Sequence, residues 1–94
     1  QAIVHGCRVG DDALIGMGAT ILSWSNIGAG ALVAAGALIK EHEKIPDRTL
    51  WAGVPAKQRS LIGDDMSQRM QAGWQHYVQL GKNYRSDDDT LSNH

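Results

Sequence analysis

The sequence predicts a mainly β fold, in which a left-handed parallel β-helix of hexapeptide repeats is followed by a C-terminal α-helix. Three observations predict it. Branched aliphatic residues recur at one unbroken period of six, at Ile3, Val9, Ile15, Ile21, Ile27, Val33 and Ile39. From Val9 onward a small residue stands two positions before each of them, at Cys7, Ala13, Ala19, Ser25, Ala31 and Ala37. Glycine is frequent, at 11 of the 94 residues, whereas aromatic residues make up only 5%.

The period of six excludes the two simplest elements. An α-helix repeats every 3.6 residues and a single strand every two, so neither places one large aliphatic residue inward at every sixth position. A triangular coil with three short strands per turn, about 18 residues, does so. Gly6, Gly18, Gly30 and Gly36 share the fourth place of the hexad, where we expect a corner with positive φ. Trp24 also falls at this place and predicts a distorted corner or one stacked against a neighbour.

We expect four segments along the chain. Residues 1–54 are predicted to be β-helix turns from the C-terminal part of a longer β-helix, because Ala2-Ile3-Val4 already fits the repeat and the first residue is not Met. The period is expected to end after Ile39, with a charged loop over residues 40–44, a turn at Pro46 and a last strand ended by Pro55. Residues 55–63 are predicted to be a connector.

The last two predicted segments are a helix over residues 64–85 and a polar tail over residues 86–94. Asp64 or Asp65 is the expected N-cap. The buried face of this helix is predicted from residues spaced by three and four, namely Met66, Met70, Gly73, Tyr77, Leu80 and Tyr84.

Composition limits the classes of partner. The net charge is −1, so we expect no nucleic-acid-binding surface. No apolar run approaches the roughly 20 residues of a membrane span, so we expect no membrane insertion. A single cysteine cannot form an internal disulfide and fits a reducing compartment, which makes the cytoplasm the expected location.

Outward positions of the predicted coil carry apolar residues. With about 18 residues per turn, Leu14 stacks on Leu32, Met17 on Ala35 and Thr20 on Leu38. A contiguous apolar face of this kind is expected at a subunit interface. The alternative is scattered surface hydrophobic residues, which are normal on soluble proteins.

The run from His5 to Leu22, HGCRVGDDALIGMGATIL, closely resembles the γ-class carbonic anhydrase family. The ending is also similar, with Gly-Val-Pro-Ala-Lys at residues 53–57 and then an expected helix that carries Tyr77 and Tyr84. The resemblance extends to about Arg85. Gly-Val-Pro-Ala-Lys is shared with hexapeptide acyltransferases, whereas His-Gly-Cys followed by Ile-Gly-Met-Gly-Ala is far more discriminating.

The resemblance implies a homotrimer with a divalent metal, zinc or alternatively iron, held between subunits by three histidines. His5 matches one of these ligands, and the other two would lie upstream. Tyr77 matches a tyrosine near the metal cleft that orients bound water or bicarbonate, although packing alone explains its place equally well. The implied activity is reversible hydration of carbon dioxide, because zinc lowers the pKa of bound water to about 7. A lone His is otherwise a surface or interface residue, and Cys7 is expected to be core.

Two other functions fit the same repeats. A hexapeptide acyltransferase would use a catalytic His and acyl-coenzyme A between subunits, but such chains normally end soon after the Pro-Ala-Lys turn, whereas about 37 residues follow Lys57. A metal-binding scaffold without catalysis is the third candidate, because a fold does not by itself determine an activity.

Overall fold

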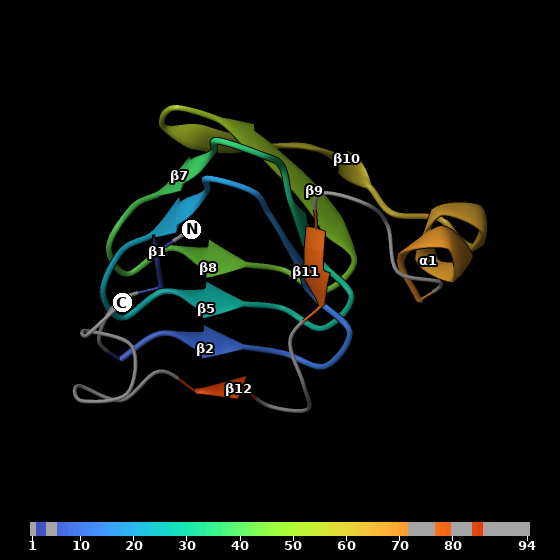
Figure 1. Ribbon diagram of the computed structural model, residues 1–94, viewed down its shortest axis with the longest axis horizontal. Helices are drawn as coiled ribbons and strands as arrows, with labels where there is room; N and C mark the ends of the chain where they lie inside the picture. The colour runs from blue at the N-terminus through green and yellow to red at the C-terminus, as the bar shows by residue number, and fades with distance from the viewer. Residues whose placement is uncertain (1, 4–5, 72–76, 80–83, 86–94) are drawn as a thin grey trace.

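The computed structural model describes residues 2–3, 6–71, 77–79 and 84–85. Nine short strands come first along the chain, and a tenth strand, one helix and two further strands follow (Figure 1). The elements are β1 (Ala2–Ile3), β2 (Arg8–Val9), β3 (Leu14–Gly16), β4 (Thr20–Ile21), β5 (Asn26–Ile27), β6 (Leu32–Val33), β7 (Leu38–Ile39), β8 (Lys44–Ile45), β9 (Thr49–Gly53), β10 (Ala56–Leu61), α1 (Asp64–Gln71), β11 (Tyr77–Gln79) and β12 (Tyr84–Arg85).

The first nine strands form three parallel ladders, β1-β4-β7, β2-β5-β8 and β3-β6-β9. Each strand pairs with the strand three places further along the chain, and the register joins equivalent places of successive turns, such as Leu14 with Leu32 and Thr20 with Leu38. The chain therefore returns to the same ladder once in every turn. This confirms a mainly β architecture of stacked three-strand turns. We call residues 6–53 of this arrangement the coil.

The inward residues of the period form one apolar interior. Ile15, Ile21, Val33 and Ile39 are fully buried, and the small residues that precede them are buried with them. The expectation that the period ends at Ile39 is wrong. Ile45 and Trp51 continue it, belong to the same interior cluster and are 3% and 9% exposed.

The continuation of the period through Ile45 and Trp51 is not obvious from the sequence, because charged outward residues surround Ile45. The predicted loop over residues 40–44 is a corner followed by β8, in which Lys44 faces solvent and Ile45 faces the interior. Trp51 fits inside because its polar group is satisfied there. Its Nε1 donates to Thr49 Oγ1 at 3.1 Å, and the Thr49 hydroxyl donates to the Pro46 carbonyl at 2.7 Å.

Corners of the coil have a common backbone conformation. The fourth place of each hexad has positive φ throughout residues 6–48, as predicted for the glycines. Trp24 adopts the same conformation, with φ of 64°, and its indole lies across Gly6 of the preceding turn. A Cβ atom at Gly6 would collide with that ring. Trp24 is thus stacked against a neighbour without disturbing the regular corner.

The predicted connector over residues 55–63 is largely a strand. β10 pairs antiparallel with β9 through a tight turn at Gly53, which has φ of 107°, and the Val54–Pro55 peptide bond is cis. Every β10 residue after Ala56 is exposed, and Ala56 faces the interior. The edge of β9 provides a ladder for this segment to join.

The predicted helix over residues 64–85 is correct only at its start. α1 begins at Asp64 as expected but ends at Gln71. Tyr77 and Tyr84 lie in strands, with β11 antiparallel to β3 and β12 antiparallel to β2. At these two tyrosines, backbone pairing with β3 and β2 outweighs the helical spacing. Across the described part of the chain, no helix has the length and apolar character needed to cross a membrane.

A second apolar cluster lies outside the coil. Leu14 and Leu32 point outward from the β3-β6-β9 ladder and are covered by Ile62 and Met70, and all four side chains are at most 4% exposed. α1 therefore packs on this face (Figure 1). The prediction that Leu14 and Leu32 form a subunit interface is wrong, because their own chain covers them. Met17, at 61% exposed, stays open to solvent.

Candidate functional site

The corner that precedes β2 is the place of the predicted metal ligand. His5 itself lies outside the described residues, so its role stays a prediction. The next residue, Gly6, is described, and the Trp24 indole covers it from the following turn. Trp24 is 50% exposed. One face of the indole therefore packs on the coil while the rest forms an exposed aromatic surface at this corner.

Metal binding needs more ligands than the described residues bring together. A catalytic zinc is held by three protein ligands with one position left open. Of the four histidines, only His42 lies in the described ranges, where it is an exposed corner residue. Within residues 6–71 and the short described segments, no group of three or more His, Cys, Asp or Glu side chains could hold a metal ion. These residues therefore do not fit the implied site by themselves.

Tyr77 does not stand on a helix as the resemblance implied. It is the first residue of β11, and its backbone lies opposite Gly16. The position of its side chain is outside what the structure describes. Its role as a residue that orients water or bicarbonate stays a prediction.

Cys7 is a core residue, as expected from its place among the small residues. Its side chain is 0% exposed and belongs to the interior cluster. The Sγ atom donates to the Leu22 carbonyl at 2.9 Å. Burial and this contact place the thiol away from solvent, which does not suit a nucleophile.

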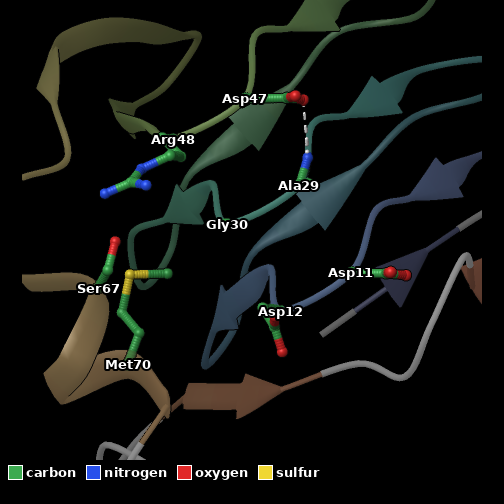
Figure 2. Close-up of a pocket in the computed structure, with 8 residues that line it drawn as sticks. All are labelled: Asp11, Asp12, Ala29, Gly30, Asp47, Arg48, Ser67 and Met70. Atoms are coloured by element: carbon green, nitrogen blue, oxygen red, sulfur yellow. Dashed lines mark hydrogen bonds between the residues drawn. The ribbon is translucent and has the colours of Figure 1, made fainter. Parts of the chain in front are cut away.

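The described residues also form a pocket between the coil and α1 (Figure 2). Its volume is about 230 Å³. One side consists of corner residues from three successive turns of the coil, and the other consists of two helix residues. The lining is Asp11, Asp12, Ala29, Gly30, Asp47, Arg48, Ser67 and Met70.

Two of the charged side chains that line this pocket, Asp47 and Arg48, form hydrogen bonds that join parts of the fold. The Asp47 carboxylate accepts the Ala29 amide at 2.9 Å, which joins two successive corners (Figure 2). Arg48 donates to the Asp64 carboxylate at 2.9 Å. Among the described lining residues, the Ser67 hydroxyl has no histidine beside it to act as its base. The pocket lies where α1 packs against the corners of the coil.

Sequence analysis named Gly30 as a corner and Met70 as part of a buried helix face, but it did not predict that these residues line one pocket. Asp11 and Asp47 occupy the same corner two turns apart, and this recurrence is the signal that could have marked the corner. The contribution of Ser67 and Met70 could not be anticipated, because it depends on where α1 packs.

Residues 6–41 match the family described as Bacterial transferase hexapeptide (six repeats). A curated relative is γ carbonic anhydrase 2, mitochondrial, from Arabidopsis thaliana, which is 37% identical over 88 residues. The match covers 94% of this chain and 32% of that protein. The chain therefore spans about a third of the length of this relative.

Several solved structures with a similar fold are described as transferases. A Bacillus cereus protein assigned to the acetyltransferases has a TM-score of 0.72 and 42% identity, covering 77% of this chain and 42% of that one. PerB from Caulobacter crescentus, solved with CoA and GDP-perosamine, has a TM-score of 0.60 and 37% identity. That match covers 63% of this chain and 28% of PerB.

Proposed function

We propose, on the premise that this chain is a hexapeptide-repeat protein similar to the γ carbonic anhydrases, that the protein reversibly hydrates carbon dioxide. The observation that carries the proposal is the extent of the plant carbonic anhydrase match. It runs through 94% of the chain and so includes residues beyond the repeats that transferases share. The stacked three-strand turns and the buried period of six provide the scaffold on which such a site is built.

The fold proposed for the intact protein is a left-handed parallel β-helix. The ladders, in which each strand pairs with the third strand after it, support three strands per turn, and the family of hexapeptide repeats supports the left-handed sense. The proposed compartment is the cytoplasm, supported by a single, buried cysteine.

The proposed assembly is a homotrimer. Leu14 and Leu32 no longer support it, because α1 covers them. Support comes instead from Met17, which is 61% exposed, and from the partly exposed Leu38 and Leu22 on the outer side of the turns. These residues leave apolar surface that a second copy of the chain would cover.

His5 is proposed as one ligand of a zinc ion, with iron as the alternative, and Tyr77 as the residue that orients water or bicarbonate. The remaining ligands come from outside the described residues, because those residues hold no metal-binding cluster. His5 would hold the metal together with the remaining ligands, and a zinc ion there would supply the Lewis acidity that activates water for hydration.

The test compares His5→Ala with His42→Ala in the intact protein. His42 is a matched control because it is an exposed corner histidine. Metal content, thermal unfolding and carbon dioxide hydration are measured on both variants. We expect His5→Ala to lose most of the metal and activity while the unfolding temperature stays near that of the unmodified metal-free protein. Full metal occupancy in His5→Ala would refute the ligand assignment.

A transferase is the second candidate, favoured by the two acetyltransferase-like structures and by the CoA bound in PerB. In this case the protein would bind acyl-CoA and transfer the acyl group in the absence of metal. An acyl-CoA binding measurement on metal-free protein separates the two candidates. Bound metal without hydration activity and without CoA binding would instead indicate a scaffold.

A further inference from the structure

We draw no further inference here: the strongest candidate, the pocket between the corners of the coil and α1, is a cluster of three aspartates, Asp11, Asp12 and Asp47, and no second feature of the described residues points to a ligand for it.

Discussion

The coil and the C-terminal region after Gly53 are stabilised in different ways. In the coil every turn repeats the same arrangement, and the inward residues form one continuous interior cluster that ends with Trp51 and Ala56. The described part of the C-terminal region has no interior cluster of its own. β10, α1, β11 and β12 each add to an edge or a face of the coil, and the outer cluster is much smaller than the interior one. The repeat thus specifies its own structure, whereas the C-terminal region depends on the surface it meets.

This difference predicts that interior substitutions damage the whole fold and outer ones damage a part. Each turn of a repeat protein is stabilised mainly by its neighbours, so a defect in one turn weakens the stack. A defect on the outer face releases one element and leaves the ladders intact.

The largest effect is expected from Ile21→Ala, because Ile21 is 0% exposed inside the coil. Loss of buried methyl and methylene groups, together with the cavity left behind, should lower the free energy of unfolding by about 3 to 4 kcal/mol. Urea denaturation measures it. Thr20→Ala is the matched control, since Thr20 is the outward neighbour on the same strand. Equal urea denaturation midpoints for the two variants would contradict the assignment of every sixth residue to the interior.

A smaller loss is expected from Gly16→Ala, which tests the close stacking of turns. A Cβ atom on Gly16 would meet the backbone of Ala34 and Ala35 in the next turn. The turns must separate to admit it, at a cost of about 2 to 3 kcal/mol. Gly36→Ala is the control, because Gly36 has φ of 71° but open space around it. Gly36→Ala should lower the free energy of unfolding by only about 1 kcal/mol, the cost of placing a Cβ atom on a backbone with positive φ. A reversed order in urea denaturation would show that the stacking is looser.

The prediction of the coil succeeded because the information is local and repeated. Each inward place from Val9 to Ile45 carries an aliphatic residue, and six of the eight corners at residues 6–48 carry Gly, Asp or His, which tolerate positive φ. The expected end at Ile39 was wrong because the charged residues around Ile45 resemble a surface loop. Ile45 and Trp51 nevertheless keep the same spacing of six. An aromatic residue inside the coil was unexpected, and its fit depends on the hydrogen bond to Thr49.

The C-terminal region could not be predicted because its partners are distant in sequence. The helical spacing around Met66 and Met70 is real, and α1 uses it. At Tyr77 the same pattern competes with strand pairing to β3, a partner that no local signal reveals. The candidate site shows the same limit. The resemblance predicts His5 and Tyr77 as site residues, and both stay predictions, because the spacing of residues within the repeats would not encode a site formed between segments or subunits.

A local effect is expected from Met70→Ala, because Met70 holds α1 against Leu14 and Leu32. Its loss should weaken docking of α1 by about 2 kcal/mol, at the lower end for removal of a buried Met side chain. Hydrogen exchange distinguishes local from global loss. The amide of Ser67 in α1, which is hydrogen-bonded to the carbonyl of Gly63 just before the helix, should exchange faster. The Thr20 amide, bonded to Ala37 in the coil, should not. Gln68→Ala, an exposed position on the same helix, is the control.

The smallest effect is expected from Asp64→Asn, which tests whether charge holds α1 on the coil. Asp64 pairs with Arg48 at 2.9 Å, and the two side chains are 94% and 50% exposed. Exposed ion pairs contribute little, because water and salt screen them, so the loss should be at most about 0.5 kcal/mol. Asp65→Asn is the control, since Asp65 shares the first turn of α1 and its favourable interaction with the helix dipole. Exchange at the Ser67 amide measures both variants, and in about 1 M salt their difference should vanish. A loss greater than that of Met70→Ala would mean that the ion pair, and not the outer apolar cluster, attaches the helix to the coil.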